Sequence, residues 1–287
     1  MSYPLNQATS IGYVQLKVKD LNRSITFYKE VIGLSILVQE AETVSLTVDG
    51  VHPLLVLEQH QEAVAKPRHT TGLYHFAILV PDRRSLGQSL LHLIESKYPL
   101  SGASDHQFSE ALYLSDPDGN GIEIYADRPR EQWTRDSAGQ FATMSDPMDV
   151  QGVLADAGEH VWRGLPLGTV MGHVHLHVAN IQKSKEFYVD ILGFDATIYY
   201  GDQALFVSAG GYHHHIGLNT WAGAGAPTPP EGSVGLRFFT IVVPNKGDLS
   251  GIENELKSAG IPTDRRYGGV FVKDPAGNGI VLVVATN

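Results

Sequence analysis

The histidine run 213–215 stands out in this sequence, together with His75, Glu123 and His173, which lie far from it in the chain. Imidazole and carboxylate groups bind divalent metal ions and move protons near them. Two histidines and one carboxylate around a metal leave coordination positions open for a substrate and O₂, which is the arrangement of non-haem Fe(II) oxygenases. Such chemistry requires a fold that brings three distant residues together.

Composition narrows the class of protein. The chain has 287 residues, of which 43% are hydrophobic, so it can bury a large core and is long enough for two domains. It contains no cysteine, which excludes disulfides and thiolate metal sites. The formal charge of −10 disfavours nucleic acid and suits a small neutral or weakly acidic substrate. Residues 1–10 show no secretory signal and apolar runs such as 280–285 are strand-sized, so we expect a cytoplasmic protein that does not span a membrane.

Four segments of the chain repeat one pattern. Each begins with the alternation typical of a strand, continues through a polar residue, and then shows apolar residues at helical spacing. The segments are 11–34, 73–96, 172–194 and 236–260, and their polar residues are Asp20, Asp82, Asn180 and Asn245. Further apolar runs follow the predicted helices, and in 112–126 and 270–285 an Asp-Pro-x-Gly-Asn-Gly turn separates two short strands. Each unit is therefore predicted to be a βαβββ module.

The spacing of the polar residues groups the modules into pairs. The first two polar residues are 62 residues apart and the last two are 65 apart, whereas 98 residues separate the second from the third. We therefore predict an N-terminal domain at 8–126, a connection at 127–168 and a C-terminal domain at 169–287, with two modules in each domain. The connection contains charged residues, several Pro and Gly residues and a short helical pattern at 150–157.

These modules resemble a known superfamily. GHVHLHV and FYVDILGF in the third module, and DPDGNGIEIY at the end of the second, are similar to sequences of the vicinal oxygen chelate superfamily. Over nearly all of its length the chain resembles the two-domain extradiol ring-cleaving dioxygenases of the catechol 2,3-dioxygenase type. The resemblance implies an α+β fold of four βαβββ modules in two tandem domains, and a divalent metal held between two facing modules.

Alignment of the four modules shows which of them offer metal ligands. One position of the first strand, seven residues before the polar residue, is occupied in module order by Tyr13, His75, His173 and Phe238. On the last strand, Glu123 of the second module corresponds to Val281 of the fourth. The resemblance implies ligands on the first strand of one module and on the first and last strands of the other, so we expect His75, Glu123 and His173 to bind the metal where modules two and three meet. In the superfamily's commonest arrangement both modules of the C-terminal domain carry the site; here the first and fourth modules should form a counterpart without ligands.

Other interpretations of these residues stay open. A single histidine on a strand is more often structural than a ligand. The alternative for Glu123 is a solvent-facing position on a one-sided sheet, but its apolar neighbours in the strand favour an inward position, where a carboxylate needs a counter-charge such as a bound cation. His175 and His177 share the face of His173 by strand alternation. We expect structural roles for both or a role next to the ligands, for which His175 is the better candidate.

The resemblance also implies residues for proton transfer. YHHHIGL is similar to the family's HHxIAL strand start and places His214 as the acid-base histidine. Tyr113 lies ten residues before Glu123, which is the family's offset for a tyrosine beside the metal, and His106 resembles another active-site histidine. The alternatives are a surface turn or an incidental metal trap for the histidine run, and a buried aromatic residue with a backbone partner for Tyr113.

We therefore expect an extradiol dioxygenase that cleaves catechol or a substituted catechol, a small aromatic diol, with O₂ at an Fe(II) site. Mn(II) is the alternative metal because the ligand set suits both ions. Two rivals use the same modules. A glyoxalase-like isomerase or lyase, or a thiol transferase, more often has two carboxylates at its site, and a non-catalytic protein that binds aromatic drugs needs no metal. The sequence is silent on the ring substituents of the substrate and leaves open whether the chain forms a homo-oligomer.

Overall fold

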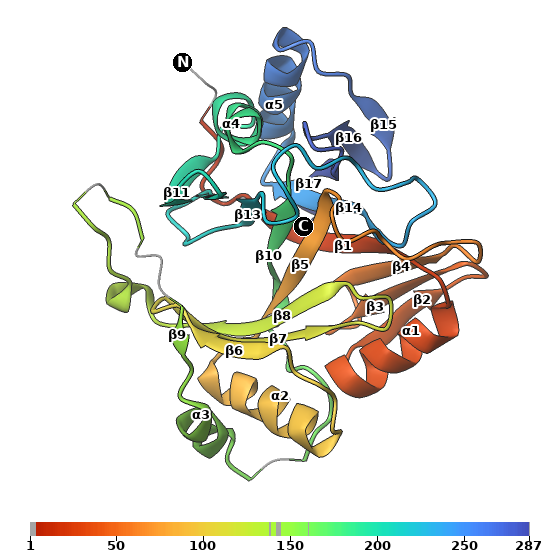
Figure 1. Cartoon of the computed structure of the whole chain (residues 1–287), viewed down its shortest axis with the longest axis vertical. Coiled ribbons are helices and arrows are strands. Elements are labelled where there is room, and N and C mark those ends of the chain that lie inside the picture. Colours follow the sequence, from red (N-terminus) through yellow and green to blue (C-terminus); the bar gives the residue numbers. More distant parts are fainter. Residues whose placement is uncertain (1–3, 138, 142–144, 160, 287) are drawn as a thin grey trace.

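Two curled β-sheets form the framework of the protein (Figure 1). The structure is a computed structural model that describes residues 4–137, 139–141, 145–159 and 161–286. The predicted connection at 127–168 is thus described except at 138, 142–144 and 160. Each of the four repeated units is a strand, a helix and three further strands, so the prediction of an α+β fold with four βαβββ modules is confirmed.

The first two modules precede the connection. Module one consists of β1 (Ser10–Val18), α1 (Leu21–Phe27), the π-helical turn η1 (Tyr28–Ile32), β2 (Ser35–Gln39), β3 (Thr43–Thr47) and β4 (Leu55–Gln59). Module two consists of β5 (Gly72–Leu79), α2 (Arg83–Glu95), β6 (Gly102–Asp105), β7 (Ser109–Ser115) and β8 (Gly121–Asp127). The connection adds the 3₁₀ turn η2 (Arg130–Gln132), β9 (Asp146–Pro147) and α3 (Val150–Ala157). The short helix predicted at 150–157 is therefore confirmed.

The last two modules follow the connection. Module three consists of β10 (Val170–His177), α4 (Ile181–Lys185), the π-helical turn η3 (Glu186–Ile191), β11 (Asp195–Tyr200), β12 (Ala204–Ser208) and β13 (Ile216–Asn219). Module four consists of β14 (Gly235–Val243), α5 (Lys246–Ser258), β15 (Asp264–Arg266), β16 (Gly269–Lys273) and β17 (Gly279–Val284). Among the described residues, none of the helices is both long and apolar enough to cross a membrane.

The polar residue after each first strand starts the helix of its module. The side chains that accept a hydrogen bond from the backbone N–H three residues later are those of Asp20, Asp82, Asn180 and Asn245. Such an N-cap satisfies one of the N–H groups that a helix start leaves without a partner. In module one the helical segment ends at Gly33, whose φ of 90° lies in the left-handed region that favours glycine.

Each sheet combines modules from opposite halves of the chain. The first sheet joins modules one and four in the order β15-β16-β17-β14-β1-β4-β3-β2, and the second joins modules three and two in the order β11-β12-β13-β10-β5-β8-β7-β6-β9. The junctions are the antiparallel pairs of β1 with β14 and of β10 with β5. Modules two and three therefore meet, as the distribution of ligands predicts, whereas the division into domains at 8–126 and 169–287 stays a prediction.

A buried tyrosine links the two modules of each half. Tyr28 in η1 donates a hydrogen bond to Asp116 at 2.8 Å, and Tyr188 in η3 donates one to Asp274 at 3.0 Å. Both aspartates begin the predicted Asp-Pro-x-Gly-Asn-Gly turns and also accept the backbone N–H four residues later. The sheets thus join the two halves of the chain, and these turns join the modules within each half.

Candidate metal centre

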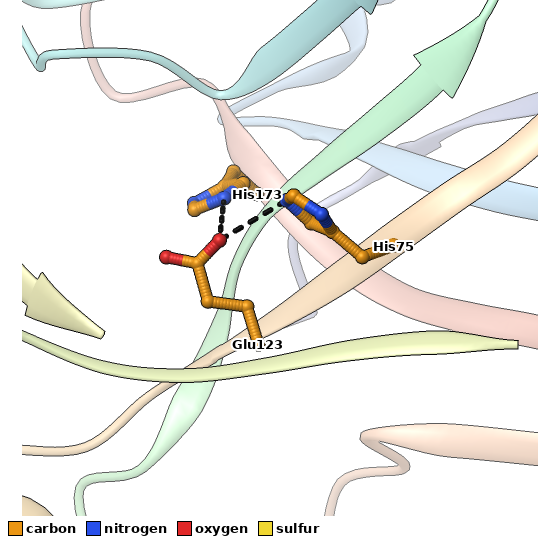
Figure 2. Close-up of side chains that lie close together, drawn as sticks. All are labelled: His75, Glu123 and His173. Carbon is orange, nitrogen blue, oxygen red and sulfur yellow. Dashed lines mark hydrogen bonds and ion pairs between the residues drawn. The ribbon is translucent and has the colours of Figure 1, made fainter. Parts of the chain in front are cut away.

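Three neighbouring strands of the second sheet carry the predicted ligands. On β5, His75 and Ala77 point to the same face because side chains alternate along a strand. Ala77 is paired with Glu123 on β8 and with His173 on β10. Residues that pair directly share a face of the sheet, so the glutamate and His173 flank the small alanine. Figure 2 shows the three side chains converging from these strands.

The donor atoms of the three residues lie close together. Nε2 of His75 is 3.0 Å from one carboxylate oxygen of Glu123, and Nε2 of His173 is 3.2 Å from the same oxygen (Figure 2). One nitrogen or oxygen atom from each residue lies within 4.8 Å of the others, and all three residues are buried. The fold therefore brings together the three residues that the sequence predicts as ligands.

The charges in this cluster suit metal binding. Burial by itself raises the pKa of Glu123, but His173 and His75 hold it well below its usual range. Burial lowers the pKa of His173 to about 4, although Glu123 opposes the shift. At neutral pH the cluster therefore offers a neutral imidazole at His173 and an ionised carboxylate. These are the protonation states in which such groups bind a metal ion.

The cluster fits a metal ion better than it fits a set of hydrogen bonds. Nε2 of His75 is buried and close to Glu123, yet it makes no hydrogen bond of suitable geometry with the described residues. Buried polar atoms are nearly always paired. A cation between the three donor atoms would use the lone pair of this nitrogen and compensate the buried carboxylate. Imidazole nitrogen and carboxylate oxygen are the donors of non-haem Fe(II) sites.

His175 lies beside the predicted ligands. It is paired with His75 across β10 and β5, and the two ring centres are 5.0 Å apart. Gly217 on β13 leaves room for it, because a Cβ at that position would lie 2.8 Å from the His175 ring. His177, by contrast, hydrogen-bonds the side chain of Asn219 at 2.7 Å. The structure thus places His175 next to the cluster and gives His177 a partner away from it.

Tyr113 and His106 lie on the other side of Glu123. Tyr113 on β7 is paired with Glu123, and its hydroxyl is 2.7 Å from Nε2 of His106. Burial, together with the charge of Glu123 and a hydrogen bond to it, raises the pKa of Tyr113 well above its ordinary value. The phenol therefore stays protonated at neutral pH and can donate a hydrogen bond. Tyr113 thus adjoins Glu123, and His106 adjoins Tyr113, while their roles stay predictions.

The histidine run lies in a turn before β13, which begins at Ile216. The ring of His214 is buried, and its centre is 4.1 Å from that of His173. His213 is fully buried and hydrogen-bonds His214. His215 turns away, and its Nδ1 accepts a hydrogen bond from the backbone of Ala209 at 3.2 Å. Two of the three histidines thus belong to the surroundings of the cluster, and the alternative of a surface turn is wrong.

Two contributions to the site have no counterpart in the sequence analysis. Asp127 at the end of β8 has its Oδ1 2.9 Å from Nε2 of His213. Alternation along β8 from Glu123 through Tyr125 to Asp127 is the signal that predicts this shared face. The connection supplies Trp133, whose ring centre is 5.3 Å from that of His213. Trp133 lies outside regular strands and helices, so no periodic pattern predicts its position.

Known proteins resemble all or part of this chain. The family model of the Glyoxalase/Bleomycin resistance protein/Dioxygenase superfamily matches residues 10–124 and 170–282. Catechol-2,3-dioxygenase from Bacillus subtilis (strain 168) is 47% identical over 282 residues, which cover 98% of this chain and 99% of that protein. The metallothiol transferase FosB from Staphylococcus epidermidis (strain ATCC 12228 / FDA PCI 1200) is 27% identical over 121 residues, which cover 42% of this chain and 82% of that protein.

Solved structures share the fold. A putative dioxygenase from Bacillus subtilis superposes with a TM-score of 0.67 at 14% identity, and the match covers 99% of this chain and 87% of that chain. Glyoxalase I from Zea mays superposes with a TM-score of 0.58 at 16% identity, covering 96% of this chain and 92% of that chain. The family match in both halves and the 47% identity to one relative settle the family. This chain belongs to the Glyoxalase/Bleomycin resistance protein/Dioxygenase superfamily.

Proposed function

We propose that this protein is an extradiol ring-cleaving dioxygenase that opens catechol or a substituted catechol with O₂. The observation that carries the proposal is the buried set of His75, Glu123 and His173 on neighbouring strands. Further support comes from the 47% identity, over 98% of this chain, to a protein named catechol-2,3-dioxygenase. The single carboxylate of the cluster argues against a glyoxalase-like isomerase or lyase and against a thiol transferase. A buried ligand set also argues against a binding protein without a metal.

Nε2 of His75, Nε2 of His173 and the carboxylate of Glu123 would hold the metal ion, for which we propose Fe(II), with Mn(II) as the alternative. When bound, such an ion supplies a positive centre with open positions for the two catechol oxygens and for O₂. The chain supplies the placement of the donors. All three stand on paired strands of one sheet rather than on loops, so the sheet fixes their mutual positions.

His214 is the residue that we propose for proton transfer. Its ring centre lies 4.1 Å from that of His173, so it borders any substrate held at the cluster. Its Nδ1 is engaged with His213, which leaves Nε2 to take a proton from a catechol hydroxyl and to return it during ring opening. Positioned general acids and bases of this kind contribute about 10² to 10⁴-fold to turnover.

Tyr113 and His106 are proposed to orient the oxygen atoms of the reactants. The protonated hydroxyl of Tyr113 stands next to Glu123 and can donate a hydrogen bond to a substrate or O₂ oxygen. Nε2 of His106 lies 2.7 Å from that hydroxyl and limits its rotation. The two polar groups thus stand next to each other beside Glu123.

Oxygen uptake tests the proposal. The full chain is reconstituted anaerobically with Fe(II) and then given O₂ with catechol, or with hydroquinone, whose hydroxyls are not adjacent. We expect one O₂ consumed per catechol, with both oxygen atoms in a ring-opened product, and much slower uptake with hydroquinone. Protein that holds Fe(II) but cleaves neither diol would refute ring cleavage. Protein that binds neither Fe(II) nor Mn(II) would favour the rival binding protein.

A further inference from the structure

We infer that His213 is a positioning residue that fixes the orientation and the tautomer of His214, and that Asp127 does the same for His213. The inference rests on the proposed role of His214 in proton transfer. Asp127 and His213 lie outside the cluster formed by His75, Glu123 and His173. They act on the reaction only through the ring of His214.

A series of hydrogen bonds leads from the end of β8 to His214, whose ring lies beside that of His173. Oδ1 of Asp127 lies 2.9 Å from Nε2 of His213, and Nδ1 of His213 lies 2.8 Å from Nδ1 of His214. The ring centre of His214 is in turn 4.1 Å from that of His173. The His213 side chain is fully buried, whereas 23% of the Asp127 side chain is exposed. The Asp127 end of this series of hydrogen bonds thus reaches solvent, and the His214 end reaches the predicted ligand His173.

The order of the partners determines the tautomers. An ionised carboxylate only accepts hydrogen bonds, so Nε2 of His213 carries the proton that it donates to Asp127. A neutral imidazole has one ring proton, so Nδ1 of His213 is an acceptor and Nδ1 of His214 is the donor. Burial lowers the pKa of His213, which supports the neutral ring. Nε2 of His214 is then unprotonated, as a nitrogen that takes a proton from the substrate must be.

Aromatic packing holds the His213 ring in this position. Phe108 stacks on it with ring centres 4.4 Å apart and an interplanar angle of 19°. The Tyr212 ring is 4.0 Å away, and its hydroxyl hydrogen-bonds that of Tyr125 at 2.7 Å. Trp133 of the connection packs against the same ring. A ring enclosed in this way keeps its orientation, so the direction of its Nδ1 toward His214 is fixed as well.

The connection also fixes the turn that precedes the histidines. Arg130 donates a hydrogen bond to the backbone oxygen of Gly210, and Arg135 donates one to that of Gly211, each at 3.2 Å. These contacts hold the chain just before the histidine run 213–215. The connection at 127–168 is therefore part of the structure that positions His214, starting from the carboxylate of Asp127.

Substitutions at His213 separate positioning from simple packing. His213→Leu keeps much of the side-chain volume but removes the atom that accepts the hydrogen bond from Nδ1 of His214. His213→Asn instead supplies an amide oxygen that can accept this hydrogen bond near the former position of Nδ1. We expect His213→Leu to lower kcat by about 10² to 10³-fold with nearly unchanged KM and metal content. His213→Asn should recover at least about tenfold of that loss, because it restores the acceptor. His215→Asn, at a half-buried neighbour outside these hydrogen bonds, is the matched control and should retain wild-type kcat.

Nuclear magnetic resonance of the ring nitrogens reads the tautomers directly. In the full chain loaded with diamagnetic Zn(II), we expect the Nδ1–H tautomer for His214 and the Nε2–H tautomer for His213. Asp127→Asn, which weakens the constraint without removing a ring, should introduce the other tautomers and lower kcat. An Nε2–H tautomer of His214 in the wild type, or a metal-bound His213→Leu variant with wild-type kcat, would overturn the inference. A wild-type protein with the expected tautomers but no ring cleavage would instead refute the proposed function and leave the positioning of His214 intact.

Discussion

The two sheets are built alike and differ in the side chains at their centres. In each, the first strand of one module pairs antiparallel with the first strand of another and parallel with the last strand of its own module. The pair of Ala77 and Glu123 in the second sheet corresponds to the pair of Thr240 and Val281 in the first. The same backbone register thus presents a carboxylate in one sheet and an apolar side chain in the other.

Aromatic residues fill the centre of the first sheet. The cluster there comprises the buried residues Phe238, Phe271 and Val281, with the partly buried Tyr13, Tyr267 and Val283 packed against them. The ring centres of Tyr13 and Phe238 are 5.9 Å apart, and those of His75 and His173 are 5.7 Å apart. The counterpart in the first sheet therefore has nearly the same ring spacing as the candidate metal centre. The fold sets the geometry, and the side chains decide whether a metal can bind.

Replacement of the Glu123 carboxylate, which the first sheet lacks, should have the largest effect on metal binding and ring cleavage. Glu123→Gln keeps the shape of the side chain but removes the charge that a metal needs, so metal affinity should fall by more than about 100-fold and ring cleavage should be lost. Metal content after dialysis and O₂ uptake measure both effects. The matched control is Val281→Ala in the first sheet, which opens a small cavity there and should leave metal content unchanged. Wild-type metal content in Glu123→Gln would remove this residue from the ligand set.

Loss of the acid-base group should be the next largest effect. His214→Ala should keep the metal and depress turnover by about 10² to 10⁴-fold, because the proton of the substrate loses its acceptor. Substrate affinity should change less than kcat, which steady-state kinetics with catechol can separate. Full activity in this variant, alongside an inactive variant at another histidine of the run, would move the proton transfer to that histidine.

A single exchange can make the centres of the two sheets more alike. Ala77→Thr introduces the residue that the first sheet has at Thr240, and it adds a methyl and a hydroxyl group between Glu123 and His173. We expect overpacking to lower stability by about 1–3 kcal/mol and metal affinity to fall by about 10 to 100-fold. Calorimetric titration with Mn(II) measures the affinity.

The reverse exchange is the control. Thr240→Ala removes the hydroxyl that accepts a hydrogen bond from the backbone of Tyr13, so it should destabilise the protein by about 1–3 kcal/mol without changing metal affinity. An equal loss of metal affinity in both variants would mean that the two sheets are not independent in this respect.

Acidification should lower the stability of the protein mainly through the histidine-rich second sheet. Burial lowers the pKa of His215 to about 3, from an ordinary value near 6.5. The unfolded chain therefore binds a proton at this residue more readily than the folded chain does. Protonation of His215 thus costs no stability above about pH 6.5, and the free energy of unfolding falls as the pH drops from there toward 3. The loss from one group is at most about 1.4 kcal/mol per pH unit.

Denaturant unfolding at pH 7 and pH 4.5 checks this effect. His215→Asn keeps an acceptor for the backbone of Ala209 but does not titrate, so its free energy of unfolding should fall less on acidification than that of the wild type. An identical fall in both proteins would show that His215 does not contribute to the acid sensitivity.

Local and repeated features could be predicted from the sequence. Helix starts depend on neighbouring residues, and the side chains predicted to begin the four helices all cap them, as for Asp20 and Asn180. The candidate ligand set could be predicted because a repeat places equivalent residues at equivalent positions of its strands. His75 and His173 therefore had to share a face of the sheet if their modules met. Glu123 followed from the same alignment of last strands.

Contacts that depend on tertiary packing could not be predicted in this way. The histidine run 213–215 lies in a turn, where strand alternation does not determine which ring faces the cluster. The position of Trp133 against His213 depends on how an irregular connection folds back over the second sheet. The hydrogen bond of Asp127 to His213 joins residues 86 positions apart, and only its place on β8 hints at the shared face.

The most direct test of the central claim is anomalous diffraction from crystals of the full chain grown anaerobically with Mn(II) or Fe(II). The account predicts one metal peak per chain, within bonding distance of Nε2 of His75, Nε2 of His173 and the carboxylate of Glu123. It also predicts no peak at the counterpart around Tyr13 and Phe238. A metal bound by other residues, or a second sheet that stays empty while metal binds elsewhere, would contradict it.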